Sequence, residues 1–410
     1  MTMKTALALT LSMGLVATAA TAQTRSLRTL LRDDSTSLAR IAVQAGDCAT
    51  PATQCSLGRT LADGWDGGVA YVPARNTTWY SDGAELTEIA GSCGLACSVT
   101  PKLVLGRLSR IGGLAASPGL EELYQVESIA GRAAITTYSI SAGCAVAGGS
   151  TTFTLPTPFH RAGAIAYDGA RQHLWVASSA FWIGGAANVL YLFERTRTGW
   201  SQLCTAPVDS CSRPAVGQIQ GMAFEACRRV LWIADAGRVY EQSVSYRTPC
   251  PTLTSLGCCG SPGGEACHGL DVELGQVQSV GSSCTSRGCV SCPNMVLAVR
   301  GRPVVGNKAV QLQVLNGPTG GTGFAMLNGG PCRGVPFACG QLYPSLVTPW
   351  IVVPMGTLAG SRRCDGDAFF TFPIPNNYGL CGVELCAQGL VICPSLDLAL
   401  TNGLNLLIEG

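Results

Sequence analysis

The sequence predicts an all-β protein whose long N-terminal part repeats one hairpin and whose C-terminal part is a smaller β-structure. The first supporting observation is a pattern of an apolar strand, a short polar turn and a second apolar strand, which occurs five times. The second is a series of short strand-like stretches after Asn294, separated by glycine- and proline-rich turns. The third is composition: 51 glycines and only 13% charged residues are typical of β-rich exported proteins.

Residues 1–22 have the features of a signal peptide. Lys4 provides a positive charge, residues 6–16 are apolar, and Ala20-Thr-Ala22 matches the small-residue cleavage pattern. This apolar run is too short to span a bilayer, and no later segment is apolar for long enough. We therefore expect a secreted or cell-surface protein without a membrane span.

The charge content limits the partners. A net charge of +2 with no basic run argues against nucleic acid and anionic membranes as main partners. We therefore expect the binding partner to be an extracellular protein or a glycan.

All 21 cysteines follow the signal peptide, so we expect disulfides formed in an oxidising compartment. Because the number is odd, one cysteine is either free or paired with another chain. The closely spaced cysteines suggest four short-loop disulfides, and the sequence does not fix their connectivity. These pairs are Cys48/Cys55, Cys93/Cys97, Cys204/Cys211 and Cys332/Cys339.

The hairpin repeat has constant internal spacing. Its third residue is alanine in four copies and Asp271 in the fifth. The copies begin at Gly68, Gly113, Ala164, Gly221 and Gly269, and eleven residues later stand Trp79, Tyr124, Trp175, Trp232 and Val280. A fixed hairpin with connections of variable length is the mark of a structural repeat.

The repeat predicts blades of a β-propeller. A hairpin that is apolar on both faces must be covered on both faces, as each blade is by its neighbours. Later stretches such as 133–140 and 239–244 add strands, giving four per repeat. After an N-terminal segment at 23–35, we expect five blades over residues 36–290. In the last blade, strands at 38–43 and 56–61 join two strands of the fifth copy, which removes an exposed sheet edge. Six blades would require a further degenerate copy.

This pattern resembles the blades of NHL and SMP-30-type β-propellers. The resemblance implies a fold and no particular function. Lactonases of that kind hold a divalent cation in the central channel with acidic and asparagine side chains. This sequence shows no matching set of channel residues.

The C-terminal part, residues 291–410, predicts a small antiparallel β-sandwich. Expected strands lie at 295–299, 309–315, 346–353, 368–372, 383–390 and 404–408. Gly306-Asn307, Phe372-Pro-Ile-Pro-Asn376 and the ending Leu398–Leu404 resemble a domain that closes many bacterial exported proteins of unassigned function. That resemblance implies no activity.

One set of acids could form a site. Fourteen residues after each repeat start stand Asp82, Glu127, Ser178, Asp235 and Ser283. If the blades are equivalent, these residues lie near one level, where Asp82, Glu127 and Asp235 are candidate ligands for calcium. The favoured interpretation is that these acids cap turns through backbone N–H groups, with no metal or other cofactor.

Other candidates carry less chemistry. Trp182, in a glycine-rich loop, is a candidate ligand-binding residue, whereas the repeat tryptophans are expected to pack between blades. The spacing of Cys289 and Cys292 fits a metal site, but disulfides are favoured in an exported chain. No catalytic residue is assigned, because the three histidines have no accompanying nucleophile or metal motif.

The leading interpretation is therefore an exported, non-enzymatic protein that acts in binding, recognition or structure outside the cytoplasm. The first alternative is a calcium-dependent hydrolase or lactonase of the SMP-30 kind. The second is a subunit of an extracellular assembly, as the low charge and the odd cysteine suggest.

Overall fold

The computed structural model describes residues 25–31, 37–44, 47–48, 52–56 and 67–410. Within the last range the undescribed positions are 82, 84, 92, 118–120, 141–142, 156–159, 181–187, 209–218, 236–237, 248–249, 261–266, 346 and 348. The regular secondary structure of the described chain is almost entirely β-strand, as predicted, with one short helix at Tyr378–Leu380. None of its helices is long and apolar enough to cross a membrane.

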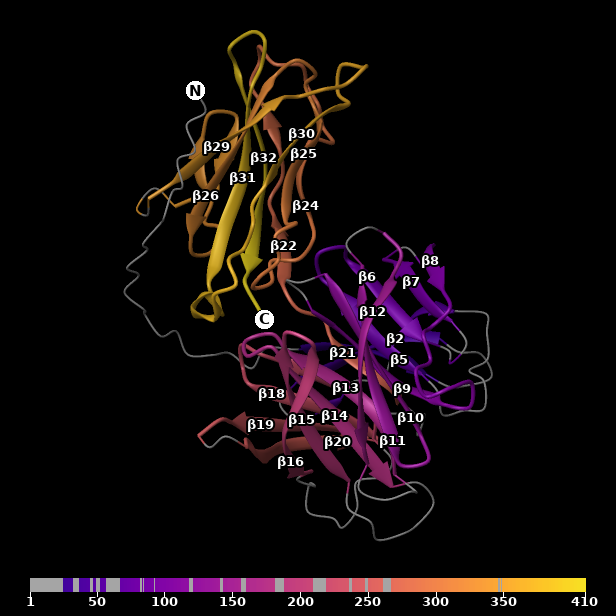
Figure 1. Ribbon diagram of the computed structural model, residues 1–410. Coiled ribbons are helices and arrows are strands. Elements are labelled where there is room, and N and C mark those ends of the chain that lie inside the picture. The colour runs from indigo at the N-terminus through magenta and orange to yellow at the C-terminus, as the bar shows by residue number, and fades with distance from the viewer. Residues whose placement is uncertain are drawn as a thin grey trace.

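Five antiparallel sheets of four or five strands make up the N-terminal part (Figure 1). Sheet I contains β21 (Cys267–Val272), β1 (Arg25–Leu31), β2 (Ser37–Gln44), β3 (Asp47–Cys48) and β4 (Ala52–Ser56). Sheet II contains β5 (Gly68–Val72), β6 (Thr77–Ser81), β7 (Leu86–Ala90) and β8 (Leu95–Val99). Sheet III contains β9 (Arg110–Ser117), β10 (Glu122–Ile129), β11 (Arg132–Ser139) and β12 (Val146–Thr154). Sheet IV contains β13 (His160–Asp168), β14 (His173–Ala180), β15 (Val189–Thr196) and β16 (Gly199–Pro207). Sheet V contains β17 (Ile219–Glu225), β18 (Val230–Asp235), β19 (Arg238–Ser245) and β20 (Thr252–Gly260).

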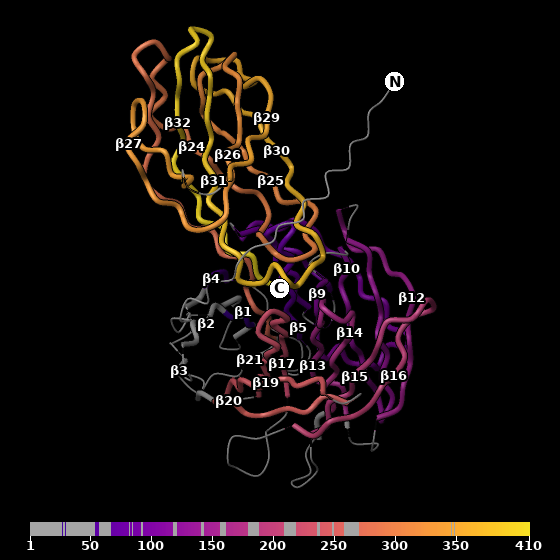
Figure 2. The backbone as a smooth tube through the Cα atoms, turned by 90° about the vertical axis from the view of Figure 1, so that its left-hand side faces the viewer, coloured from indigo at the N-terminus to yellow at the C-terminus, as the bar shows by residue number. Residues whose placement is uncertain are grey.

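The innermost strands of the five sheets contact one another in a closed circle. The order is β5, β9, β13, β17, β21 and again β5. Figure 2 shows these strands near the middle of the N-terminal part, with β12, β16 and β20 toward the outside. Sheets with sequential strand order around a common centre are the arrangement of a β-propeller.

The repeat residues explain why the sheets pack in this way. Trp79, Trp175 and Trp232 are 0%, 0% and 2% exposed, so these side chains pack between sheets as predicted. The small residues at the repeat starts lie where inner strands converge. A Cβ atom on Gly113 would come within 3.0 Å of the Ala164 Cα atom, so this position has little room for a side chain.

The circle is closed by strands from both ends of the N-terminal part. Strand β1 pairs with β21, with Leu27 opposite Val272, and β2 lies beside β1. The prediction that N-terminal strands join the fifth copy agrees with this pairing, although β1 comes from the 23–35 segment. The predicted strand at 56–61 lies outside the described residues except for Ser56 in β4.

The fifth copy differs from the prediction in its second strand. Strand β22 (Gln276–Val280) leaves sheet I and pairs with β32 (Leu398–Leu407) in the C-terminal region, which we define as residues 276–410. The physical reason is composition: β22 has Val280 where three other copies have tryptophan, and its side chains are largely exposed. Such a strand supplies too little apolar surface to be buried between two sheets.

Two sheets form most of the C-terminal region. One contains β22, β32, β31 (Glu384–Ile392), β26 (Thr322–Gly329), β29 (Ile351–Thr357) and β23 (Cys284–Thr285). The other contains β24 (Val296–Arg300), β25 (Gln311–Gly317) and β30 (Gly366–Thr371), and β27 (Val335–Phe337) forms a hairpin with β28 (Gly340–Leu342). Leu297 and Val314 from the second sheet share one buried cluster with Ala387 and Leu406 from the first. All six strands predicted here overlap observed strands, and β26 was missed.

The C-terminal region is attached to one end of the circle of sheets (Figure 1). A disulfide joins Cys227, in the turn after β17, to Cys381. The Arg302 side chain donates to the Tyr71 hydroxyl at 3.1 Å and lies 2.6 Å from a Glu273 carboxylate oxygen. These contacts fix the two parts of the chain against each other.

Candidate functional site

The centre of the circle, where a propeller lactonase would hold its cation, is nearly filled. A chamber of about 30 Å³ lies between the inner strands, lined by residues such as Ala115, Ala166 and Ala223. Tyr378 and Gly410 of the C-terminal region also line it. This volume holds about one water molecule. The chamber is therefore too small for an organic substrate.

Asp271, the fifth copy's departure from alanine, lies at this centre and has a structural role. Its carboxylate accepts hydrogen bonds from the backbone N–H groups of Tyr71 and of Val272, the latter at 2.8 Å. Tyr71 belongs to β5 and Asp271 to β21. The carboxylate thus joins the first and last inner strands of the circle.

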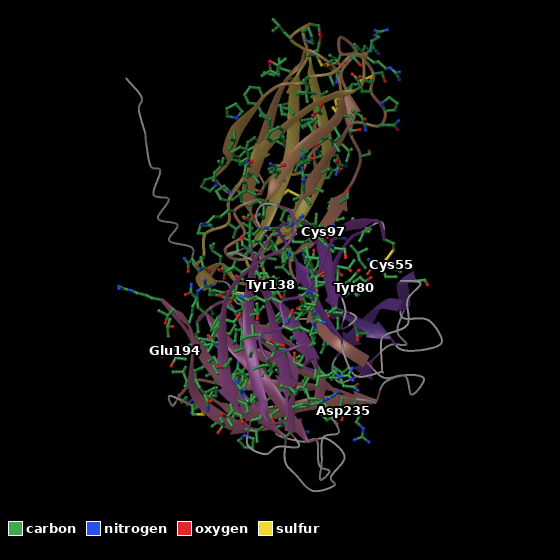
Figure 3. The ribbon with its side chains drawn as sticks, turned by 45° about the vertical axis from the view of Figure 1, so that its right-hand side comes forward. Cys55, Tyr80, Cys97, Tyr138, Glu194 and Asp235 are labelled. Atoms are coloured by element: carbon green, nitrogen blue, oxygen red, sulfur yellow. A yellow bond between two sulfur atoms is a disulfide. The ribbon has the colours of Figure 1, made fainter. Side chains whose placement is uncertain are left out.

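Two of the three predicted acids, Glu127 and Asp235, accept hydrogen bonds from other groups of the protein. Glu127 is fully buried and accepts from the backbone N–H groups of Val104 and Leu105 and from the Ser109 hydroxyl. Asp235 accepts from the Tyr240 hydroxyl at 2.6 Å. Figure 3 places Asp235 at the end of the circle that is remote from the C-terminal region. Glu127 therefore binds the backbone of a loop, as turn capping requires.

The described members of the set do not all lie in the circle of sheets, contrary to the hypothesis of one level. Ser178 is buried in β14, whereas Ser283 lies beyond β22 in the C-terminal region, because the fifth hairpin does not stay in the circle. Asp82 and Trp182 are outside the described residues. Among the residues that the structure describes, no three His, Cys, Asp or Glu side chains are grouped to hold a metal ion.

Eight disulfides are present among the described cysteines, and all four short-loop pairings are wrong. The pairs are Cys55–Cys93, Cys97–Cys144, Cys204–Cys250, Cys227–Cys381, Cys284–Cys339, Cys289–Cys393, Cys292–Cys364 and Cys332–Cys386. The side chains of Cys48, Cys211, Cys258, Cys259 and Cys267 lie outside the described part of the structure. Cys289 pairs with Cys393 and Cys292 with Cys364. The Cys289/Cys292 motif therefore forms disulfides and not a metal site.

The reason for the wrong pairings is geometric. Three of the disulfides link the outer parts of adjacent sheets: I to II, II to III, and IV to V. Their Cα–Cα distances are 5.6, 5.5 and 5.8 Å, within the usual disulfide range. Cysteines that are close in sequence belong to one sheet, whereas those that pair face each other from neighbouring sheets.

Sheets III and IV are joined by aromatic side chains, and the described residues provide no disulfide between them. Tyr124 takes the place of the repeat tryptophan, and Trp200 from β16 packs edge-on against it, with ring centroids 5.3 Å apart at 89°. The Tyr124 and Tyr167 centroids are 5.0 Å apart, and those of Phe153 and Phe193 are 4.7 Å apart. Such pairs stabilise beyond the burial of their area.

A two-pronged ion pair lies beside this aromatic cluster. Both Arg195 guanidinium nitrogens contact the Glu122 carboxylate, one at 2.7 Å from Oε1. The Tyr124 hydroxyl donates to Glu122 Oε2 at 2.7 Å. The hydrogen bond with Glu122 raises the pKa of Arg195. Burial, followed by the neighbouring Tyr167 and Glu122, raises the pKa of Tyr124, so Tyr124 stays a hydrogen-bond donor.

A groove of about 460 Å³ opens next to the ion pair, and we call it the III–IV groove. Its lining consists of Glu122, Thr137, Ser139, residues 146–149 of β12 and residues 195–200 at the β15–β16 turn. In β12 a bulge places Gly148 and Gly149 opposite Thr137. The Trp200 indole nitrogen donates to the Thr137 hydroxyl at 3.4 Å. This volume is typical of small-ligand sites.

A second groove at the junction of sheets IV and V provides a comparison. It measures about 480 Å³, but the Cys204–Cys250 disulfide lies beside it and no charged residue lines it. The III–IV groove combines similar space with charged and aromatic side chains. For this reason we take it as the candidate site.

Several solved structures align with this chain at low sequence identity and low TM-score. A Lactobacillus plantarum protein aligns over 94% of this chain and 100% of its own, at 10% identity and a TM-score of 0.36. A functionally unknown protein of Desulfotomaculum acetoxidans aligns over 57% and 70%, at 12% identity and 0.35. A 6-phosphogluconolactonase-like protein of Bacteroides uniformis aligns over 59% and 73%, at 11% identity and 0.34. No family model and no curated protein sequence matches the chain. At such TM-scores these similarities carry no argument about function.

Proposed function

We propose that this protein is an exported, non-enzymatic recognition module. A five-bladed β-propeller over residues 25–272 carries the III–IV groove as its binding site, and a C-terminal β-sandwich covers one end of the propeller. Two features support export: the signal-peptide pattern of residues 1–22, and disulfides of the kind that form in oxidising compartments.

The main support for this proposal is the difference between the centre of the circle of sheets and the III–IV groove at its outer edge. At the centre, alanine, larger apolar and tyrosine side chains leave about 30 Å³, and the Asp271 carboxylate is engaged with two backbone N–H groups. At the rim, the III–IV groove offers about 460 Å³ lined by charged, hydroxyl and aromatic groups. A recognition role uses the rim, whereas a lactonase of the SMP-30 kind would use the centre. The geometry therefore favours recognition over the calcium-dependent hydrolase.

Gly149 provides a direct test. A Cβ atom at this position would meet nothing within 4 Å, so Gly149→Trp fills the groove without a clash at the backbone. We expect the intact protein to bind immobilised cell-envelope material from the organism that produces it. Gly149→Trp should reduce that binding at least about tenfold. The matched control is Leu203→Trp, at a partly exposed position of β16. Equal binding by both variants would contradict the proposal, as would a specific turnover by the pure protein.

A second candidate function is a subunit of an extracellular assembly, which the β29 edge favours. Strand β29 lies at the end of its sheet and pairs with β26. Val347, just before it, is 93% exposed, and Val352 within it is 50% exposed. The sequence has no charged residue from Gly334 to Gly360. Uncharged, exposed apolar edges are sites of strand-to-strand association.

Sedimentation velocity over a range of protein concentrations tests this second function. The assembly model expects a concentration-dependent oligomer that Val352→Lys converts to monomer, because a lysine at an edge opposes strand pairing. Arg287→Lys, an exposed site in the same region, is the control. A wild-type protein that is monomeric throughout the range excludes the assembly function.

A further inference from the structure

We propose that the III–IV groove takes an extended acidic peptide, which pairs as an added strand with the free edge of β12. This inference rests on the recognition function proposed above and specifies the class of ligand. Three features of the groove lead to it: a strand edge, an excess of cations, and an open approach to the backbone.

The strand edge comes first. Strand β12 is the outermost strand of sheet III, and in the described part of the chain it pairs only with β11. Its residues Val146–Gly149 are exposed and form one wall of the groove. The outer N–H and C=O groups of an edge strand have the spacing of another peptide chain. Domains that bind peptides by strand addition use such an edge for affinity and flanking pockets for specificity.

The charges select the kind of peptide. Arg195 and Glu122 neutralise each other through their two-pronged ion pair. Arg197 also lines the groove, and it forms no ion pair with another described residue. The groove therefore has an excess of positive charge, which favours acidic side chains.

The approach to the β12 backbone is open at Gly149. This residue is exposed, and a Cβ atom there would meet nothing within 4 Å. On the opposite side, the backbone N–H of Trp200 donates to the Thr151 hydroxyl at 3.0 Å, which holds the β15–β16 turn beside β12. The groove is thus bounded on two sides by fixed backbone.

The experiment uses the full chain with its disulfides and three labelled decapeptides. One alternates Glu and Val, the second Lys and Val, and the third Ser and Val. Fluorescence anisotropy at low salt should show the tightest binding for the Glu/Val peptide, with affinity falling as salt rises. Arg197→Glu should weaken that binding about tenfold. Arg287→Glu, which makes the same charge change in the C-terminal region, should leave it unchanged.

The outcomes separate this inference from the recognition function. Similar affinity for the three peptides, or an unchanged affinity in Arg197→Glu, overturns the acidic-peptide inference. An acidic glycan probe, oligogalacturonate, serves as the rival ligand. Suppose that oligogalacturonate binds, that Gly149→Trp abolishes its binding, and that the Glu/Val peptide does not bind. The recognition function then stands and the acidic-peptide inference fails. If Gly149→Trp changes the binding of neither the envelope material nor any probe, both the recognition function and the peptide inference fail.

Discussion

The Tyr378 ring lies directly against Gly169, so that a Cβ atom at residue 169 would overlap the tyrosine hydroxyl oxygen. Gly169 belongs to the turn after β13, and Tyr378 belongs to the short helix Tyr378–Leu380 of the C-terminal region. The contact therefore requires a glycine at this turn for close docking of the two parts. It also gives a variant pair that tests the docking.

Gly169→Ala should destabilise the protein by about 1–3 kcal/mol, because the added methyl group overpacks the contact. Tyr378→Phe removes the hydroxyl oxygen, and the nearest ring atom of residue 378 lies 3.7 Å from the position that the added methyl group would take. The double variant should therefore recover most of the loss, as urea unfolding would measure. Additive effects of the two substitutions would show that the docked contact does not form in solution.

The Cys227–Cys381 disulfide should make the two parts of the chain unfold together. It connects residues separated by 154 positions, and cross-links of this kind contribute about 2–4 kcal/mol. Replacing both cysteines with serine should lower the Tm and split the calorimetric transition into two. Replacing Cys284 and Cys339, which pair within the C-terminal region, should lower the Tm without splitting it. A single transition in the first variant would show that the noncovalent interface alone joins the parts.

Glu127 should contribute to stability and not to metal binding. Glu127→Ala leaves the Leu105 N–H and the Ser109 hydroxyl without this acceptor, which should cost about 1–3 kcal/mol. Glu194→Ala, an exposed acid labelled in Figure 3, is the matched control and should be neutral. Chelator should leave the Tm of the wild type unchanged. A calcium-dependent rise of about 4 °C or more, lost in Glu127→Ala, would instead favour the calcium site.

Tyr138 should make the protein sensitive to alkali. Burial raises its pKa to about 12, and its hydroxyl donates to Gln125 Oε1 at 2.9 Å. In the unfolded chain a tyrosine titrates near pH 10. Because the folded pKa is raised, this stabilisation is complete below about pH 10 and falls as the pH rises toward 12. Urea unfolding should show a shallower loss of stability over this range in Tyr138→Phe than in the wild type. Parallel curves would contradict the prediction.

The repeat predicted the four-stranded sheets because one pattern applied to four of the five copies. Trp79, Trp175 and Trp232 share a spacing with their strands, and burial on both sides followed from that pattern. The pairing of β22 with the C-terminal region, rather than with sheet I, was not predictable in the same way. It depends on the partner that β32 offers, which lies more than a hundred residues further along the chain.

The candidate groove was harder to predict because its residues come from separate repeats. Arg195 and Glu122 are 73 positions apart, and Cys55 and Cys93, which pair between neighbouring sheets, are 38 apart. Two signals were nevertheless in the sequence. Tyr124 replaces the repeat tryptophan, and Arg195, Arg197 and Trp200 lie close together in the sequence around the turn between β15 and β16.

Hydrogen exchange at the β12 edge tests the central claim most directly. Backbone amides of residues 146–149 should exchange rapidly in the free protein, because this stretch is an exposed strand edge. On addition of the Glu/Val peptide, exchange there should slow at least about tenfold, whereas exchange in β29, which lies at the end of another sheet, should not change. Protection at residues 146–149 is the result we predict. Binding of the peptide with no protection at these residues would show that the groove does not recognise its ligand by strand addition.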